Sequence, residues 1–130
     1  MIVADASAVL EVLLARAGAD RVRRALAAHA EIHVPEHFHV EVLSVLRRYA
    51  LRRELSDRRA GIALAALRDL RTVRHPVLDL VPEIWALRDN LSAYDAAYLA
   101  LARRLRCELL TCDAGLAAAA ANTAPRPPAG

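Results

Sequence analysis

Two short apolar stretches that each end in an aspartate decide the fold: Met1-Ile2-Val3-Ala4-Asp5 at the start of the chain and Leu109-Leu110-Thr111-Cys112-Asp113 near its end. Runs that are apolar throughout are typical of central strands in a parallel sheet, which is covered on both faces. In such sheets, ligand sites form beyond the carboxyl ends of the strands. We therefore expect Asp5 and Asp113 to lie close together at one end of a sheet.

Helical and strand patterns alternate along the rest of the chain. We expect strands at 1–5, 31–35, 72–75 and 108–112, and helices at about 8–14, 20–30, 36–53, 56–70, 82–90, 92–105 and 114–121. Ser7 is the expected cap of the first helix. Alternating strands and helices imply right-handed crossovers and a parallel sheet, so the fold class is α/β. Periodicity does not predict the order of the strands.

Length and composition indicate one aliphatic domain. The chain has 130 residues, of which 56% are hydrophobic and only 4% aromatic. We assign residues 1–121 to this domain and expect 122–130, which hold three prolines, to be a disordered tail. No stretch approaches the roughly 18 uncharged residues that a membrane span needs, and the first residues lack the basic start of a secretory signal. We expect a cytoplasmic protein that does not contact a membrane.

The cysteines and basic residues narrow the chemistry. Cys107 and Cys112 flank or lie within one predicted strand, so their Cα atoms are expected roughly 16 Å apart, too far for a disulfide. All 18 basic residues are arginine. The absence of lysine excludes a Walker-type phosphate loop and argues against aspartyl-phosphate enzymes, whose acidic sites rely on a lysine. A GC-rich coding sequence is a sufficient cause of this arginine bias.

Two more acids, Glu41 and Asp95, lie among apolar neighbours on predicted helices. Each of the four acids has an ordinary alternative: Asp5 and Asp113 as helix caps, Glu41 as a solvated residue, and Asp95 as a first-turn acid favoured by the helix dipole. If all four converge, they repel one another, so that some are protonated or a divalent metal binds. Oxygen ligands suit Mg²⁺ or Mn²⁺ and do not favour zinc.

Four segments, taken in order, resemble the PIN domain, especially the toxin ribonucleases of bacterial VapBC toxin–antitoxin pairs. They are Met1-Ile2-Val3-Ala4-Asp5-Ala6-Ser7-Ala8, then Pro35 to Leu43 with the helical pattern E-V-x-x-x-L-R-R starting at Glu41, then Asn90-Leu91-Ser92-Ala93-Tyr94-Asp95-Ala96-Ala97-Tyr98, and finally Leu109 to Leu116. The resemblance covers about residues 1–120. It departs from the family where the chain enters the proline-rich tail and at Gly115.

The resemblance implies a three-layer PIN-like fold, with a short parallel sheet of four or five strands flanked by helices on both faces. It also implies an endoribonuclease that holds Mg²⁺ or Mn²⁺ with Asp5, Glu41, Asp95 and Asp113. Ser7 and Thr111 would supply hydrogen bonds to these acids. The expected partners are RNA, a VapB-like antitoxin that places a basic side chain among the acids, and a second copy of the chain. The alternative is a degenerate PIN-fold module that binds RNA or protein without cleaving it.

Basic and aromatic residues outside the four motifs complete the candidates. Arg47, Arg48, Arg52 and Arg53 are candidate RNA-binding residues, or else cations at the end of a solvated helix. His33, His37 and His39 could suggest zinc, but His39 is expected to point away from the other two. Few aromatics are placed to stack on bases, and Trp85 is expected in the core or at an interface.

Overall fold

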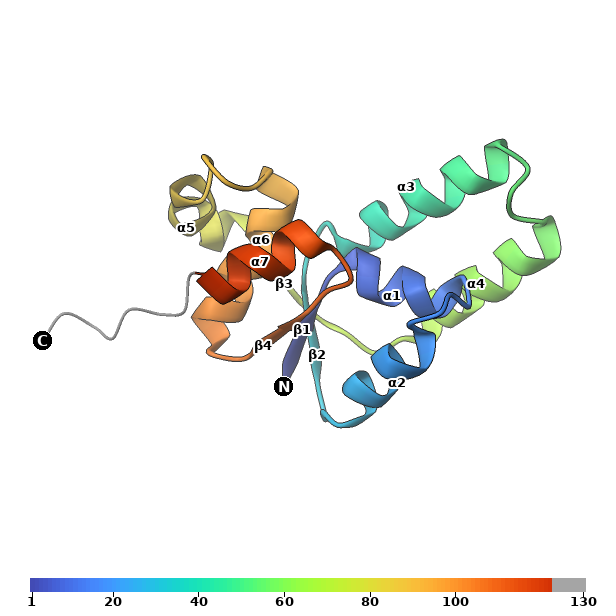
Figure 1. Ribbon diagram of the computed structural model, residues 1–130, viewed down its shortest axis with the longest axis horizontal. Coiled ribbons are helices and arrows are strands. Elements are labelled where there is room, and N and C mark those ends of the chain that lie inside the picture. Colours follow the sequence, from blue (N-terminus) through green and yellow to red (C-terminus); the bar gives the residue numbers. More distant parts are fainter. Residues whose placement is uncertain (123–130) are drawn as a thin grey trace, which may run out of the picture.

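Four short parallel strands form the centre of the computed structural model, which describes residues 1–122. They are β1 (Ile2–Ala4), β2 (Ile32–Pro35), β3 (Val73–His75) and β4 (Glu108–Leu110), in the order β3-β2-β1-β4. Strand β1 pairs with both β2 and β4, so Ile2 lies between Ile32 and Glu108. Figure 1 shows helices on both faces of this sheet. The predicted parallel α/β class is therefore confirmed.

Within residues 1–122, seven α-helices and one 3₁₀ helix connect and cover the strands. They are α1 (Ala6–Leu13), α2 (Ala19–Ala27), α3 (Phe38–Leu51), α4 (Asp57–Asp69), η1 (Val77–Leu80), α5 (Val81–Ala86), α6 (Ala93–Leu105) and α7 (Ala114–Asn122). Ser56 and Ser92 cap α4 and α6 by accepting hydrogen bonds from the third residue along, as their positions predict. Helix α7 includes Asn122, one residue beyond the predicted end of the domain, and the rest of the predicted tail, 123–130, lies outside the described residues.

Three boundary predictions are wrong, each for a local reason. Asp5, and not Ser7, caps α1, because the Asp5 carboxylate accepts the backbone hydrogen bond from Ala8 and the helix begins at Ala6. Strand β4 ends at Leu110, since the amide of Cys112 is bonded to the Ser7 hydroxyl. The predicted helix at 82–90 becomes η1 followed by the shorter α5, with Pro82 in the first turn of α5 as predicted.

Helix α6 is the central element of the hydrophobic core. Every residue from 96 to 102 is buried, and the helix packs on β1, β2, β4, η1, α5 and α7. Tyr98 and Phe38 are the largest fully buried side chains. Because α6 starts at the carboxyl end of the sheet, its first turn lies beside the ends of β1 and β4. The core thus positions Asp95 relative to the strand ends.

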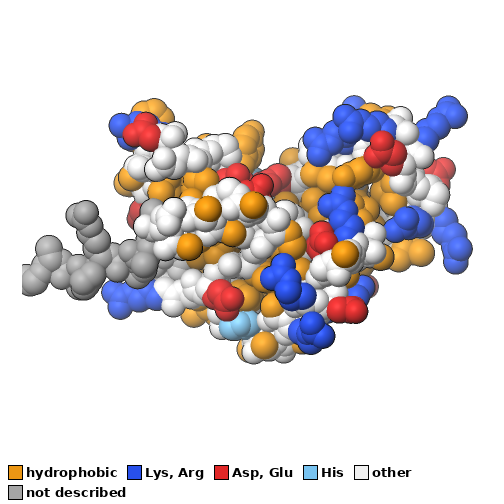
Figure 2. Space-filling model, viewed as in Figure 1, with side chains coloured by type: hydrophobic (Ala, Val, Ile, Leu, Met, Phe, Trp, Pro, Cys, Tyr) orange, Lys and Arg blue, Asp and Glu red, His pale blue; other side chains and the backbone are white. Residues whose placement is uncertain are grey.

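The surface and the cysteines bear on two further predictions. Within residues 1–122, no helix is both long enough and apolar enough to cross a membrane. Cys107 is half-buried and Cys112 is exposed, and both are free thiols, as predicted. Figure 2 shows acidic side chains in the hollow between the part formed by α5–α7 and the projecting α3–α4 hairpin, and basic side chains toward the far end of that hairpin.

Candidate metal centre

Asp5 is fixed at the end of β1 by hydrogen bonds to both carboxylate oxygens. Oδ1 accepts from the Ser7 hydroxyl at 2.7 Å and from the Ala8 amide at 2.9 Å, and Oδ2 accepts from the Thr111 hydroxyl at 2.5 Å. The side chain is almost fully buried, with 3% exposed. Burial raises the pKa of Asp5, and the hydrogen bonds from Thr111, Ala8 and Ser7 offset part of that rise.

Ser7 and Thr111 link the two strand ends through Asp5. Each hydroxyl donates to one Asp5 oxygen and accepts from the β4–α7 loop: Ser7 from the Cys112 amide at 2.9 Å, and Thr111 from the Asp113 amide at 3.0 Å. A hydroxyl has one proton to donate. The 3.2 Å contact between the two hydroxyl oxygens is therefore a close approach, and each hydroxyl donates its proton to Asp5. These bonds hold the loop carrying Asp113 against the start of α1.

Asp113 and Asp95 lie at the starts of helices, so the alternative roles of Asp113 as a helix cap and of Asp95 as a first-turn acid are correct as far as position goes. Asp113 Oδ1 accepts from the Leu116 amide at 2.8 Å, which is a capping bond for α7. Asp95 lies in the first turn of α6, where Ser92 caps its amide at 3.2 Å. Burial raises the pKa of Asp95, and the negative charges of Asp113, Glu41 and Asp5 raise it further, while His37 lowers it. The field of the other three acids therefore acts on Asp95.

Glu41 is held by two aromatic side chains. The Tyr98 hydroxyl donates to Glu41 Oε1 at 3.3 Å, and His37 Nε2 lies 3.2 Å from the same oxygen. The His37–Glu41 distance is that of an ion pair, but Nε2 lacks hydrogen-bond geometry to any partner. Tyr98 is therefore the hydrogen-bond donor to Glu41, and His37 lies beside the same oxygen. Burial and the nearby Glu41 and Asp5 charges raise the pKa of Tyr98, so it remains a neutral donor.

The family model for the PIN domain matches residues 2–122 of the chain. The chain belongs to the PIN domain family. This PIN-domain protein is 46% identical over 113 residues to the Mycobacterium tuberculosis ribonuclease VapC9, covering 87% of this chain and 86% of that protein. It is 40% identical over 118 residues to ribonuclease VapC1 of the same species, covering 90% and 89% of the two chains.

Solved structures agree on the fold. The crystal structure of M. tuberculosis VapC20, a toxin that cleaves the sarcin–ricin loop, has a TM-score of 0.69 at 20% identity and covers 92% of this PIN domain and 95% of that chain. A protein of Pyrobaculum aerophilum has a TM-score of 0.65 at 22% identity, covering 90% and 84%. At these identities the likeness concerns the fold alone.

PIN-domain ribonucleases depend on a metal in general, so we asked whether the four acids of this PIN domain suit one. The donor chemistry of the four acids suits a metal, because carboxylate oxygens are the ligands of hard divalent cations. A cation would also offset the negative charges that raise the pKa of Asp95. Their present spacing is looser: within residues 1–122, no three Asp, Glu, His or Cys side chains are arranged to hold a metal ion. The chemistry of the four carboxylates therefore fits a divalent metal.

The candidate RNA-binding arginines do not lie among the acids. Glu41 is in the first turn of α3, whereas Arg52 and Arg53 follow its last residue. At 1.5 Å per residue, this places them roughly 16 Å further along the helix direction. All four arginines, Arg47, Arg48, Arg52 and Arg53, are exposed. They form a basic end of the α3–α4 hairpin separate from the acidic hollow.

The other predicted aromatic and histidine positions have mixed outcomes. Trp85 is 66% exposed, so the core alternative is wrong. His33 lies 2.7 Å from His75 across β2 and β3, whereas His37 lies beside Glu41 on α3, so these two histidines have different partners. The hydroxyl contact of Tyr98 with Glu41 was not predicted from the sequence. The signal was the spacing of three between Asp95 and Tyr98, which puts both on one face of α6.

Proposed function

We propose that this PIN-domain protein is a Mg²⁺- or Mn²⁺-dependent endoribonuclease, the toxin component of a type II toxin–antitoxin system, which hydrolyses RNA phosphodiester bonds with metal-activated water. The observation that supports this most is the hydrogen-bonded junction of the two strand ends, where Asp5 accepts from Ser7 and from Thr111, whose hydroxyl in turn accepts from the Asp113 amide. Four acids from four separate elements influence one another at the carboxyl end of the sheet, where parallel α/β folds place their ligands. The VapC ribonucleases to which the chain is related support RNA as the substrate.

In this proposal Asp5 and Asp95 bind the metal directly, and Glu41 and Asp113 complete the site, one of them orienting the attacking water. A bound Mg²⁺ or Mn²⁺ supplies Lewis acidity and lowers the pKa of a water molecule. The chain's own contribution is to fix these acids before substrate arrives. Ser7 and Thr111 hold both oxygens of Asp5, and the core of α6 holds the backbone of Asp95. Such outer hydrogen bonds orient the ligands of a metal.

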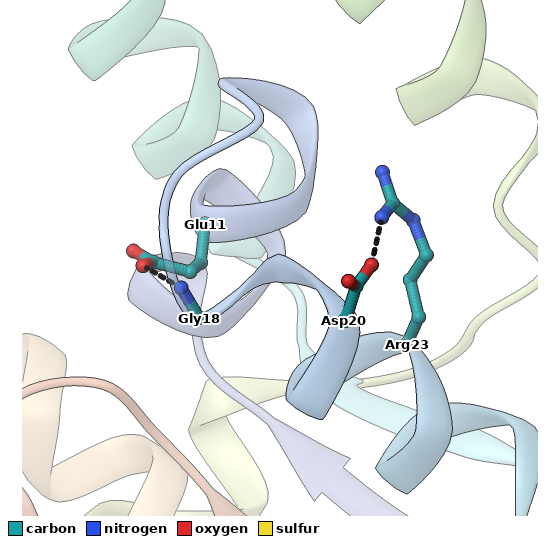
Figure 3. Close-up of polar contacts among 4 residues, drawn as sticks. All are labelled: Glu11, Gly18, Asp20 and Arg23. Atoms are coloured by element: carbon teal, nitrogen blue, oxygen red, sulfur yellow. Dashed lines mark hydrogen bonds and ion pairs between the residues drawn. The ribbon is translucent and has the colours of Figure 1, made fainter.

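Asparagine substitutions test the assignment. We expect Asp5→Asn and Asp95→Asn each to reduce Mn²⁺-dependent cleavage of single-stranded RNA by roughly 100-fold or more and to relieve growth inhibition, because each removes a metal-binding carboxylate. The matched control is Asp20→Asn on α2, where an exposed aspartate pairs with Arg23 (Figure 3). Wild-type cleavage by either site variant, with control and site variants equally folded, would refute the assignment.

The degenerate binding module remains the alternative, and the loose spacing of the acids is the observation in its favour. Titration calorimetry with Mn²⁺ separates the two functions. The ribonuclease requires binding that is lost in Asp95→Asn, whereas the absence of binding to the wild-type protein at millimolar Mn²⁺ would favour the module.

Two protein partners belong to the proposal. The first is a VapB-like antitoxin, with which the enzyme shares the cytoplasm. It inhibits the enzyme by placing a basic side chain among the acids, because an arginine there competes with the metal for the negative charges of the carboxylates. The second is another copy of the chain. We infer that it covers the apolar stripe of Leu78, Val81 and Trp85, which are exposed at intervals of three and four along η1 and α5. The exposed Arg47, Arg48, Arg52 and Arg53 would bind RNA phosphates away from the cleavage site.

A further inference from the structure

The Tyr98 hydroxyl lies where three acid-bearing elements meet. Tyr98 comes from α6, four-fifths of a turn after Asp95, and it is fully buried. Its oxygen donates to Glu41 on α3 and is also hydrogen-bonded to the backbone of Ala6, the residue that follows Asp5. A buried phenol normally places its hydroxyl on a polar partner, since an unpaired one costs about 1–3 kcal/mol. Here that requirement is met by a candidate metal ligand.

Glu41 lacks the strand-end hydroxyls that fix Asp5. It extends from a helix, and its recorded partners are Tyr98 and the half-buried His37, whose ring also packs edge-on against Tyr98 with centroids 5.2 Å apart. Both partners approach Oε1. That leaves Oε2 as the oxygen for a metal or its water. A flexible glutamate held in this way loses less conformational freedom when it binds a ligand.

We propose that Tyr98 is a positioning residue for the metal centre: its hydroxyl orients the Glu41 carboxylate and ties it to the start of α1, beside Asp5. The inference rests on the proposed function and assigns a residue outside the four acids. Tyr98 is enclosed by the core, so it does not touch RNA. Its effect must therefore pass through Glu41, and it must alter metal affinity and turnover without altering RNA affinity.

The test is Tyr98→Phe in the full-length chain, with Mn²⁺ binding measured by titration calorimetry. We expect the Mn²⁺ dissociation constant to rise roughly 10-fold, the lower end of the range for lost outer hydrogen bonds of metal sites. We also expect kcat to fall while KM for a single-stranded RNA stays unchanged. Tyr49→Phe is the matched control: it deletes the same atom from a tyrosine on α3 whose hydroxyl accepts from Arg16 at 2.6 Å, away from the acids.

A second control separates positioning from general loosening. Val22→Ala removes buried methyl groups from α2 and lowers stability without touching Glu41 or Tyr98. Equal weakening of Mn²⁺ binding in Val22→Ala and Tyr98→Phe would overturn the proposal, as would unchanged binding in Tyr98→Phe. If the wild-type protein binds Mn²⁺ and cleaves RNA in these cases, only the role of Tyr98 fails. If the wild-type protein does neither, the proposed function fails with it.

Discussion

Asp5 shows that a structural role and a proposed functional role can belong to one residue. It caps α1 through the Ala8 amide, which is its ordinary alternative, and it also lies next to the other acids. Asp113 combines the two roles in the same way at α7. The helix caps place these carboxylates at the carboxyl ends of β1 and β4, where a ligand site forms. Identifying a cap therefore gives no reason to reject an acid as a site residue.

The pKa of Asp95 predicts how the metal-free protein responds to pH. A carboxyl whose pKa is higher in the folded than in the unfolded state stabilises the fold fully below the unfolded pKa, and this stabilisation is lost as pH rises through the folded pKa. Asp95→Asn lacks the titrating group. In EDTA, we expect the melting temperature of the variant minus that of the wild type to grow as pH rises from about 4 to 7.

Thermal melts at several pH values, monitored by circular dichroism, measure this difference. Asp20→Asn is again the control, because Asp20 is exposed and pairs with Arg23 on the surface of α2. A difference for Asp95→Asn that is constant with pH, or that shrinks as pH rises, would contradict the assigned direction. With Mn²⁺ at neutral pH, the wild-type protein is expected to have the higher melting temperature of the two, because the proposed site binds Mn²⁺ and the Asp95→Asn site does not.

The four acids, Ser7 and Thr111 lie in short segments that resemble the PIN family, and the structure shows hydrogen bonds from both hydroxyls to Asp5, as the resemblance implies. The resemblance did not predict the Tyr98–Glu41 contact, which joins positions 57 apart on α6 and α3. Likewise, the predicted capping by Ser7 fails because Asp5, two residues earlier, accepts the Ala8 amide and the helix begins at Ala6. Local patterns give candidates, whereas tertiary contacts choose among them.

At the scale of elements, the connection between α1 and α2 depends on one side chain. Glu11 on α1 accepts from the Gly18 amide at 2.9 Å, just before α2 begins (Figure 3). A Cβ at Gly18 would lie 3.0 Å from Glu11 Oε1, closer than an ordinary contact. Because Gly18 has an ordinary negative φ, the close approach of Glu11, and not backbone strain, is the reason for a glycine here.

We therefore expect Gly18→Ala to destabilise the protein by about 1 kcal/mol, since Glu11 must move and the hydrogen bond weakens. In a Glu11→Ala background the same substitution is expected to stabilise by roughly 0.4–1 kcal/mol, because only the reduced freedom of the unfolded chain remains. Urea unfolding of the four proteins measures this cycle. Gly61→Ala is the control: no atom lies within 4 Å of its Cβ on α4, so it is expected to stabilise. An equal effect in both Glu11 backgrounds would exclude the steric explanation.

Across the whole molecule, the sheet order β3-β2-β1-β4 is what assembles the acids. Strand β1 lies beside β4, so Asp5 and Asp113 follow neighbouring strand ends although they are far apart in sequence. Sequence patterns predicted the strands and the class but not this order, because periodicity does not encode which strands pair. The sequence also did not predict the exposure of Trp85. A tryptophan in a helical pattern suits a core or an interface, and the 66% exposure of Trp85 excludes the core.

Because Trp85 is exposed, the proposed dimer interface at the apolar stripe can be tested by measuring the oligomeric state. If a second copy covers Leu78, Val81 and Trp85, then Trp85→Asp places a charge in the middle of the interface, where a buried aromatic typically contributes 2 kcal/mol or more. We expect the dimer dissociation constant, measured by sedimentation, to rise at least about 30-fold with the fold intact, because Trp85 lies outside the core. Leu51→Asp is the control, since Leu51 is 67% exposed on α3, away from this stripe. If the dimer is unchanged in Trp85→Asp, or if the wild-type protein is monomeric at high micromolar concentration, a second copy does not cover the stripe. If only Leu51→Asp dissociates the dimer, the interface lies on the α3–α4 hairpin instead.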